Sequence, residues 1–376
     1  MNDLRVSAIE TTIVDLPLRR PHRFAHHSID TQAYVVVRLT TDAGTVGIGE
    51  GVSPGGPWWS GESIEGQQQM IEHYLAPALL GIDCLDLHGA LARMDRVAYA
   101  NDFAKAAVEM ALIDAAARAH GVPAHVLIGG TATRRSFPVR WALSGLGEND
   151  VVQDATDHIA QGHRALKLKM GALDPDQDLR RVARLLDKIG VDLDYLADPN
   201  GAWDYRTAVW AIRELEALGV GAVEQPLKRT DLAGMVELGR RTTRIRLLAD
   251  ESVGRPADAL AVTRRRVCDA VAVKPGKAGG LRRAAQVAAI TDAAGMSCYG
   301  GTALESSIGT AASAQLFASV AQLDMGCELV GPLLLADDLV VNPLRYQDGN
   351  LYLPDGPGLG IEVDWDRVAR YARSTG

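Results

Sequence analysis

Charged side chains recur at a regular spacing in the second half of the chain, each at the end of a short apolar run. Asp198, Glu224, Asp250 and Lys274 end or follow such runs, at steps of 26, 26 and 24 residues. A step of this length accommodates one buried strand and one helix, and strands of such units are parallel and apolar because helices cover both faces. This part of the chain is therefore predicted to form a parallel α/β fold in which the four charges converge.

Eight apolar runs are expected to be strands, with amphipathic helices such as 177–189, 205–218 and 281–294 between them. The expected strands are 139–142, 165–170, 195–198, 222–225, 247–250, 270–274, 296–299 and 323–328. Eight strand–helix units predict a closed (β/α)8 barrel of the TIM type. An open doubly wound sheet is the alternative, but it should carry a G-x-G-x-x-G turn, which Gly47-Ile-Gly-Glu-Gly51 does not match.

The first part of the chain has a different pattern. Strand-like alternation comes first and helical periodicity follows, which predicts an α+β unit. The expected strands are 6–8, 33–40 and 45–50, and the expected helices are 63–80 and 101–120. We expect three parts: an α+β domain over 1–130, the barrel over 131–340, and a C-terminal segment over 341–376 that carries a strand at 350–353 and returns to the first domain.

Asp198, Glu224 and Asp250 end three successive expected strands. Active sites of such barrels lie at the carboxyl ends of the strands. Three carboxylates at matched depth are hard oxygen ligands, which suit Mg²⁺ or Mn²⁺ and leave positions for a substrate carboxylate and water. A rim salt bridge explains any one of them alone; the set predicts a divalent metal site.

Lysines form the second signal. Lys167 and Lys169 lie two residues apart on one expected strand and point the same way, while Lys274 comes from the opposite side of the barrel. Mutual repulsion and a nearby metal should lower a lysine pKa toward the range of a general base. The alternative is that the lysines are counter-ions of the acids.

Two further features follow the late strands. The glycine-rich segment 299–309, with Gly301 and Glu305, precedes a helix whose N–H groups could receive a substrate carboxylate. Glu328 ends the eighth expected strand, where a salt bridge and a catalytic hydrogen bond are equally consistent with its position.

Composition narrows the partners. A net charge of −8 gives no reason to expect nucleic acid, and no apolar stretch is long enough to cross a bilayer. The N-terminal residues lack a signal-peptide pattern, and the four cysteines include no C-x-x-C pair. We expect a cytoplasmic protein with free thiols.

These motifs resemble the muconate-lactonising subgroup of the enolase superfamily. The residues that carry the resemblance are Lys167-Leu-Lys169, Asp198-Pro-Asn200, Glu224-Gln-Pro226, Ala249-Asp-Glu-Ser252 and Lys274. Similarity to the muconate cycloisomerases extends over nearly the whole chain, through Arg20-Pro-His22, Tyr299-Gly-Gly301, the segment 327–335 and Gly356-Pro-Gly-Leu-Gly360.

The resemblance implies an α+β capping domain over a modified barrel in a homo-oligomer, such as an octamer. It assigns the metal, Mn²⁺ or Mg²⁺, to Asp198, Glu224 and Asp250, and acid/base chemistry to Lys169 and Lys274. Lys167 would hold the substrate carboxylate and assist catalysis, and Glu328 would be associated with proton donation. Further candidates for contact with a small carboxylate substrate are His22, Trp59, Asn200, Gly301 and Glu305.

The implied reaction is the reversible lactonisation of cis,cis-muconate to muconolactone through a metal-stabilised enolate, in the catechol branch of aromatic catabolism. The loop around Trp58 and Trp59 and the segment after Lys274, with Pro275, depart from the muconate pattern and leave substrate identity open. The first alternative is a racemase or epimerase of an N-acylated amino acid or dipeptide on the same lysines. A sugar-acid dehydratase is disfavoured because no histidine follows His163, and a non-catalytic small-acid binding protein would not need lysines on two sides.

Overall fold

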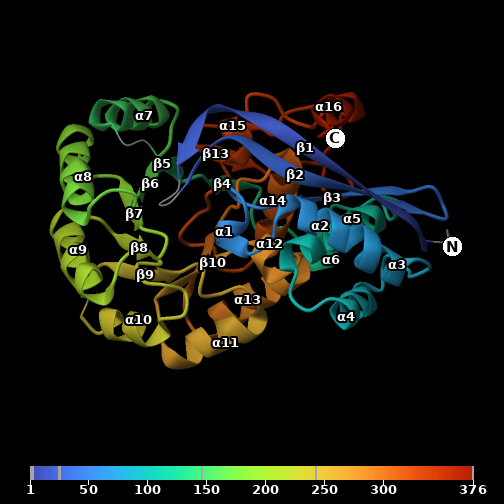
Figure 1. Ribbon diagram of the computed structural model, residues 1–376, viewed down its shortest axis with the longest axis horizontal. Helices are drawn as coiled ribbons and strands as arrows, with labels where there is room; N and C mark the ends of the chain where they lie inside the picture. The colour runs from blue at the N-terminus through green and yellow to red at the C-terminus, as the bar shows by residue number, and fades with distance from the viewer. Residues whose placement is uncertain (1–3, 24–26, 145–146, 242–243, 375–376) are drawn as a thin grey trace.

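The N-terminal region forms an antiparallel sheet backed by helices (Figure 1). The computed structural model describes residues 4–23, 27–144, 147–241 and 244–374. The sheet has the order β1-β2-β3, and its strands are β1 (Val6–Arg23), β2 (Ser28–Thr41) and β3 (Val46–Val52). The three expected strands are confirmed, but β1 and β2 are longer than the alternating segments predicted.

A stripe of glycines joins this sheet to its main helix. Gly47 and Gly49 of β3 face α5 (Asp102–Ala119), which confirms the helix expected at 101–120. A Cβ atom on Gly49 would lie 1.9 Å from the carbonyl oxygen of Ala107, and one on Gly47 would lie 2.1 Å from that of Ala111. The strand and the helix therefore pack backbone to backbone, which only glycine allows.

Substituting Gly49 tests this contact. We expect Gly49→Ala to destabilise the protein by about 3 kcal/mol or more, because the new methyl group overlaps a helix carbonyl that cannot move alone. Gly221→Ala is the control, since its Cβ would come no nearer than 3.7 Å to any neighbour. Urea unfolding of both variants measures the difference; equal stability would contradict the backbone-contact account.

The remaining helices of this region surround α5 and the sheet. The helix expected at 63–80 is confirmed as three consecutive segments, the middle one a π-helical turn. These segments are α2 (Ile64–Met70), η1 (Ile71–Leu75) and α3 (Ala76–Leu79). The others are α1 (Pro57–Ser60), α4 (Leu87–Val97) and α6 (Ala124–Ile128).

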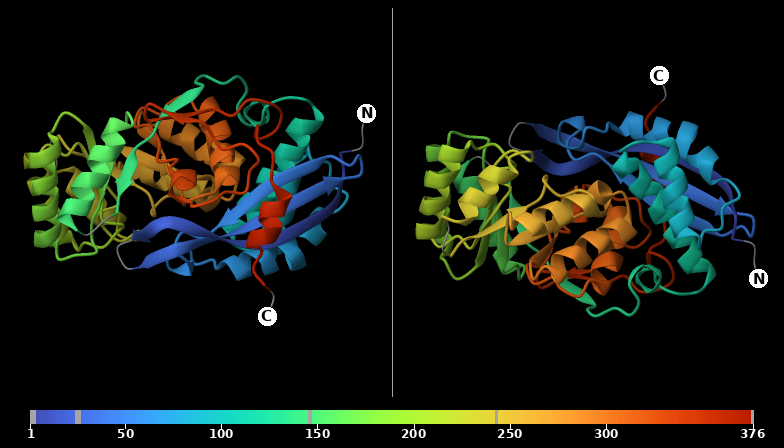
Figure 2. Two further views of the ribbon diagram at one scale, coloured as in Figure 1. Left: turned by 90° about the horizontal axis from the view of Figure 1, so that it is seen from above. Right: turned by 90° about the horizontal axis from the view of Figure 1, so that it is seen from below.

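A curled parallel sheet of seven strands forms the other half of the molecule (Figures 1 and 2). Its order is β11-β10-β9-β8-β7-β6-β5. The strands are β5 (Trp141–Leu143), β6 (Ala165–Lys169), β7 (Asp194–Asp198), β8 (Ala222–Glu224), β9 (Arg246–Ala249), β10 (Ala270–Val273) and β11 (Ser297–Gly300).

The eighth expected strand, 323–328, is wrong as a regular strand. Among the described residues it is reduced to single bridges at Cys327, one to Val139 and one to Gly300. Gly326, at φ 70°, closes a turn onto Leu323, and this turn takes up the residues that a strand would need. The two bridges still connect the ends of the sheet.

Helices follow the strands and cover the outside of the sheet, as Figure 2 shows for α7 to α11. The helices expected at 177–189, 205–218 and 281–294 are confirmed as α8, α9 and α13. The helices are α7 (Glu148–Ala160), α8 (Pro175–Ile189), α9 (Tyr205–Ala217), α10 (Leu232–Gly239), α11 (Pro256–Arg265), α12 (Pro275–Ala278), α13 (Leu281–Ala293), α14 (Ser307–Ser319) and α15 (Gly331–Leu334).

The C-terminal segment contacts both halves. Its hairpin, β12 (Tyr346–Gln347) and β13 (Asn350–Tyr352), pairs with β4 (Ser136–Pro138). Helix α16 (Trp365–Tyr371) then lies against β1, and the N–H of Arg373 donates to the carbonyl of Ile13. The domain limits at 130 and 340 stay a prediction.

Glu50, near the end of β3, lies at the seam between the halves. Its buried carboxylate accepts hydrogen bonds from the N–H and hydroxyl of Ser306, at the start of α14. Burial raises the pKa of Glu50 to about 8, and the hydrogen bonds from Ser306 only partly oppose this. Glu50 should therefore be protonated in the folded protein at neutral pH.

The pKa of Glu50 is about 8 in the folded protein, against a usual value of 4.5. Between these two pH values the folded state binds a proton that the unfolded state has released. Stability from this group is complete below pH 4.5 and is lost as the pH rises through about 8. Glu50→Gln keeps the shape without the charge, and we expect it to gain about 2–4 kcal/mol over the native chain at pH 9 but little at pH 4.5. Denaturant unfolding at the two pH values measures this; an equal effect at both would contradict it.

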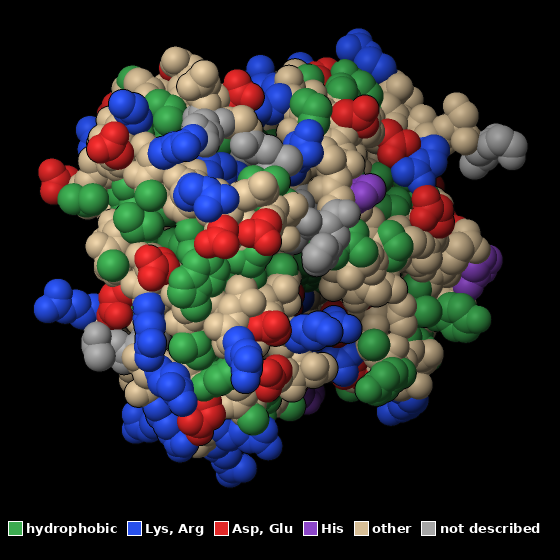
Figure 3. Space-filling model, turned by 60° about the vertical axis from the view of Figure 1, so that its left-hand side comes forward, with side chains coloured by type: hydrophobic (Ala, Val, Ile, Leu, Met, Phe, Trp, Pro, Cys, Tyr) green, Lys and Arg blue, Asp and Glu red, His purple; other side chains and the backbone are tan. Residues whose placement is uncertain are grey.

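The surface charges, the helices and the cysteines can be compared with what the composition led us to expect. Acidic and basic side chains are interspersed on the face drawn in Figure 3, with a group of Lys and Arg along its lower edge. None of the described helices has the length and apolar character needed to span a membrane. Cys84, Cys268, Cys298 and Cys327 are free and buried, which confirms the expectation of unpaired thiols.

Candidate active site

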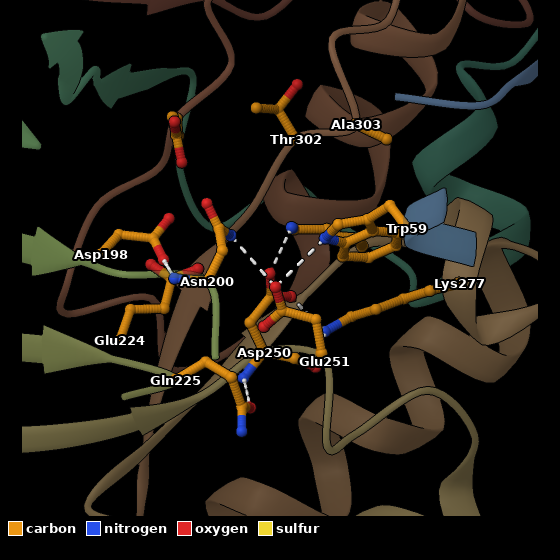
Figure 4. A network of polar contacts seen from close by, with 12 residues as sticks. Trp59, Asp198, Asn200, Glu224, Gln225, Asp250, Glu251, Lys277, Thr302 and Ala303 are labelled. Atoms are coloured by element: carbon orange, nitrogen blue, oxygen red, sulfur yellow. Dashed lines mark hydrogen bonds and ion pairs between the residues drawn. The ribbon is translucent and has the colours of Figure 1, made fainter. Parts of the chain in front are cut away.

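The three expected metal ligands lie at the carboxyl ends of adjacent strands. Asp198 ends β7, Glu224 ends β8 and Asp250 directly follows β9. All three are buried, at 0%, 0% and 1% exposure. Figure 4 draws their side chains close together in one network of polar contacts. The strand register puts Asp198 beside Glu224, because Ala197 pairs with Val223. Glu224 pairs with Leu248, so Asp250 lies two residues further along, and the expected matching depth holds only for the first two.

Lysines separate these carboxylates. Lys167 on β6 places its Nζ 2.9 Å from Asp198, 3.0 Å from Glu224 and 2.7 Å from Glu328. In the part of the chain that the structure describes, no three His, Cys, Asp or Glu side chains form a ready set of metal ligands. Lys167 occupies the position between two of the expected ligands.

Asp250 is held by two further ammonium groups. Lys274, after β10, lies 2.6 Å from its Oδ2, and Lys277 lies 2.6 Å from both its Oδ1 and its main-chain oxygen. Gln225 supports the same turn, since its side-chain oxygen accepts from the N–H groups of Asp250 and Ser252.

Lys169 lies at the near edge of the same cluster. Its Nζ donates to Asp198 Oδ2 at 2.6 Å and to Asn200 Oδ1 at 3.1 Å. Asn200 adopts a left-handed conformation, φ 47°, and its N–H donates to the other oxygen of Asp198. Lys169 and Asn200 are thereby oriented by one expected metal ligand.

The protein groups by themselves raise the pKa values of Lys167 and Lys274, so the lowered values expected beside a bound metal stay a prediction. Burial alone would lower the pKa of Lys167, but the carboxylates of Asp198, Glu224 and Glu328 raise it well above its usual value. Burial also opposes the charge of Lys274, and Asp250 and Glu224 nevertheless raise its pKa. The acids therefore outweigh the ammonium–ammonium repulsion, and both lysines are charged.

The protonation and the hydrogen bonds of the carboxylates indicate whether a divalent cation would fit among them. Burial raises the pKa of Glu224 to about 8 despite Lys167, whereas Lys167 and Lys169 overcome burial and hold the pKa of Asp198 at about 2. Glu224 has an ion pair with Lys167, but neither of its oxygens has a hydrogen-bond donor, and one oxygen of Glu251 also lacks one. Buried, under-satisfied hard oxygens are what a divalent cation would complete, so the residues fit the group.

A small cavity lies above these groups. Its volume is about 30 Å³, and its lining includes several of the expected substrate-contacting and acid/base residues: His22, Trp59, Lys167, Lys169, Asn200, Lys274 and Glu328. Burial, followed by the charges of Lys169, Arg20 and Lys167, lowers the pKa of His22 to about 3. The cavity thus combines a neutral imidazole with three lysines, a setting suited to an anion.

Gly301 and Glu305 do not line this cavity. A Cβ on Gly301 would lie 2.5 Å from Cε of Lys274, so this glycine makes room for the lysine stem. Glu305 is buried and bonds within its own loop, to the hydroxyl of Thr302 and the N–H of Ala303.

The helix start that follows this loop is filled by the protein itself. The N–H of Ser306 donates to Glu50, that of Ser307 to Asp338, and that of Ile308 to the Ser306 side chain. The expectation that these N–H groups receive a substrate carboxylate is therefore not met. Glu50 and Asp338 lie far away in the sequence, so the loop motif alone could not show them.

Glu328 lies inside the cluster. Its Oε2 accepts from Lys167 at 2.7 Å and from the hydroxyl of Tyr299 at 3.2 Å. The position of Glu328 was consistent with either a salt bridge or a catalytic hydrogen bond. The structure shows the salt bridge, a buried ion pair with Lys167, and both residues line the cavity.

One side of the site is closed by a wall of three residues, in which Trp59 of the N-terminal region meets Asn200 and Glu251 of the barrel. Nε1 of Trp59 and Nδ2 of Asn200 both donate to Oε1 of Glu251, at 3.1 and 3.0 Å (Figure 4). The Trp59 ring also lies 4.7 Å from Nζ of Lys274. A residue of α1 thus contacts the barrel cluster directly.

Three contacts in the site were not predicted from the sequence. They are those of Lys277 with Asp250, of Tyr299 with Glu328, and of Glu251 with Trp59. Lys277 follows Lys274 by one helical turn on α12, and this spacing was the available signal. Tyr299 lies in β11, one of the expected strands, but its partner Glu328 could not be read from spacing.

The fold and the site define an enzyme of the enolase type, in which a capping domain covers carboxylates and lysines at the strand ends of a barrel. Two sequence families match: "Mandelate racemase / muconate lactonizing enzyme, N-terminal domain" over residues 8–129 and "Enolase C-terminal domain-like" over 150–367. The chain belongs to the mandelate racemase / muconate lactonizing enzyme family.

Individual relatives cover the whole chain. It is 44% identical to muconate cycloisomerase 1 of Rhodococcus opacus over 375 residues, 100% of both chains. It is also 44% identical to a chloromuconate cycloisomerase of Cupriavidus pinatubonensis over 96% of this chain and 97% of the relative.

Solved structures agree with the sequence relatives. The crystal structure of 2-chloromuconate cycloisomerase from Rhodococcus opacus superposes with a TM-score of 0.96 at 41% identity, covering 98% of this chain and 100% of that one. The muconate lactonizing enzyme of Pseudomonas fluorescens, complexed with muconolactone, gives a TM-score of 0.96 at 37% identity over 99% and 100%.

Proposed function

We propose that this protein is a muconate cycloisomerase that interconverts cis,cis-muconate and muconolactone. The observation that carries the proposal is the cavity lined by Lys169 and Lys274, in a chain that matches muconate cycloisomerases along its full length. Three strands lie between β6 and β10, so the two amines come from separate parts of the sheet.

Asp198, Glu224 and Asp250 would hold the divalent cation, Mn²⁺ or Mg²⁺. When bound there, the cation supplies electrostatic stabilisation of negative charge on a substrate carboxylate. The raised pKa values of Lys167 and Lys274 show how strongly the same carboxylates attract positive charge.

The residues of the cavity account for the other needs of the reaction. Lys167 and the neutral His22 border the space for the dianionic substrate. One substrate carboxylate adds to the conjugated double bond, forming the ring C–O bond, and the electron pair moves to the neighbouring carbon. Lys169 or Lys274 then donates a proton to that carbon, and solvent restores the ammonium group. Lys274 is placed for this step because its side chain lines the cavity beside Asp250.

The direct test is an absorbance assay. The purified protein is incubated with Mn²⁺ and cis,cis-muconate, and loss of the diene absorbance is followed. Lactonisation predicts a decay that requires the metal and yields muconolactone. An unchanged diene with metal bound would refute the proposal.

An epimerase of an N-acylated amino acid or dipeptide is the second candidate, favoured by the two lysines at one cavity. Exchange of the α-proton of such substrates in D₂O, without any turnover of muconate, would support it. Silence in both assays would favour a non-catalytic small-acid binding protein. Family resemblance further suggests a homo-oligomer, such as an octamer, in the cytoplasm.

A further inference from the structure

The cavity beside the lysines is too small for the substrate that we propose. Its volume of about 30 Å³ matches roughly one water molecule. A six-carbon dicarboxylate therefore needs either a rearranged wall or another space in which to bind first.

A second cavity, of about 310 Å³, lies on the other side of that wall. This volume is at the lower end of the range of small-molecule sites, roughly 300–1,000 Å³. The two cavities share Trp59 and Asn200, and Glu251 lines the outer one. The wall between them therefore consists of Trp59, Asn200 and Glu251, in which Trp59 and Asn200 both donate a hydrogen bond to Glu251 (Figure 4).

The part of the wall contributed by α1 is built to move. Gly55, Gly56 and Gly61 border this four-residue helix with φ values of 65°, 103° and 81°. No residue of α1 is buried, and Trp58, within this helix, is 38% exposed. A swing of the Trp59 side chain would break the Glu251 bond, the Lys274 ring contact and its edge contact with the Phe103 ring.

Two cations line the outer cavity. Lys228 and Arg229 lie in the loop after β8, are exposed, and form no ion pair with any described residue. Their loop is fixed, because the carbonyl of Arg229 accepts from the Ser252 hydroxyl and that of Leu227 from the Gln225 side chain. The neighbouring acid, Asp231, is engaged as the N-terminal cap of α10. Positive charge in a hollow raises the local concentration of anions.

We propose that the outer cavity is an entrance site that first binds the dicarboxylate substrate through Lys228 and Arg229, and that Trp59 then swings away from Glu251 to admit it. This inference rests on the proposed function, since it assumes a dianionic substrate. Neither cation touches the reacting atoms, so the pair acts on capture and not on the chemical step.

The kinetic test removes the two charges. Lys228→Gln combined with Arg229→Gln should lower kcat/KM for muconate by roughly tenfold at low ionic strength, leave kcat unchanged, and lose most of the difference at 0.5 M salt, at about a 4 Å Debye length. Arg180→Gln combined with Lys188→Gln, on the outer helix α8, is the control with the same charge loss. An unchanged kcat/KM, an equal effect in the control, or a loss in kcat would overturn the entrance site.

Fluorescence tests the wall. Trp58 also lines the outer cavity, so the test uses Trp58→Phe as its background. Adipate, a saturated six-carbon dicarboxylate, should alter tryptophan emission of Trp58→Phe, and adding Trp59→Phe should abolish that change although calorimetry shows that adipate still binds. The same change in both proteins, or adipate binding without any change, would overturn the movement of Trp59. If the native chain does not turn over muconate at all, the proposed function fails, whereas native turnover with unaltered charge variants refutes only the entrance site.

Discussion

Lys169→Ala is expected to lower the turnover of cis,cis-muconate by roughly 10³-fold or more, at the upper part of the range for loss of a general acid or base. Its Nζ borders the cavity and is oriented by Asp198 and Asn200, so no neighbouring amine can reach the same position without leaving its own partner. Steady-state kinetics with saturating Mn²⁺ measure the loss.

The fold and the metal affinity should survive this change, because the side chain is partly exposed at the edge of the cluster and is not an expected metal ligand. Lys188→Ala, at an exposed site on α8, is the matched control and should keep native activity. Near-native turnover of Lys169→Ala, with Mn²⁺ bound, would show that the acid/base assignment is wrong.

Glu224→Gln should separate the stability of the metal-free protein from metal binding. The carboxyl of Glu224 is buried, its pKa is raised to about 8, and its oxygens lack hydrogen-bond donors. A carboxyl with this raised pKa is largely protonated near pH 7, so a neutral amide of the same shape changes little, and the metal-free variant should be about as stable as the native chain. Without the third anionic ligand, however, Mn²⁺ affinity and turnover should fall by at least about 10³-fold.

Thermal unfolding with and without Mn²⁺ measures both effects. A metal at 100 times its dissociation constant should stabilise the native chain by about 2.7 kcal/mol and the variant hardly at all. Equal stabilisation of the two proteins would remove Glu224 from the metal site.

Spacing predicted the arrangement of the acids and lysines because barrel strands impose it. Each strand–helix unit returns the chain to the same edge, so Asp198, Glu224 and Asp250 had to end up at neighbouring positions. The same rule could not show that the segment around Cys327 lacks a regular strand, since a turn at Gly326 competes for its backbone.

The electrostatics of the site depend on contacts that spacing does not reveal. From the sequence, only Lys169 and a metal were expected to act on the pKa of Lys167. In the structure three acids raise that pKa, including Glu328 from 161 residues away. Similarly, the start of α14 is occupied by Glu50, which lies 256 residues earlier than Ser306. The contact between Trp59 and Glu251 joins two regions whose relative placement no local pattern encodes.

The central claim is that Asp198, Glu224 and Asp250 hold one divalent cation beside Lys169 and Lys274. A crystal grown with Mn²⁺, with diffraction recorded near the manganese absorption edge, tests it most directly. We predict a single anomalous peak within coordination distance of an oxygen from each of the three carboxylates, with the Nζ of Lys167 displaced from between Asp198 and Glu224. A peak elsewhere, or one contacted by fewer than three of these side chains, would contradict the account.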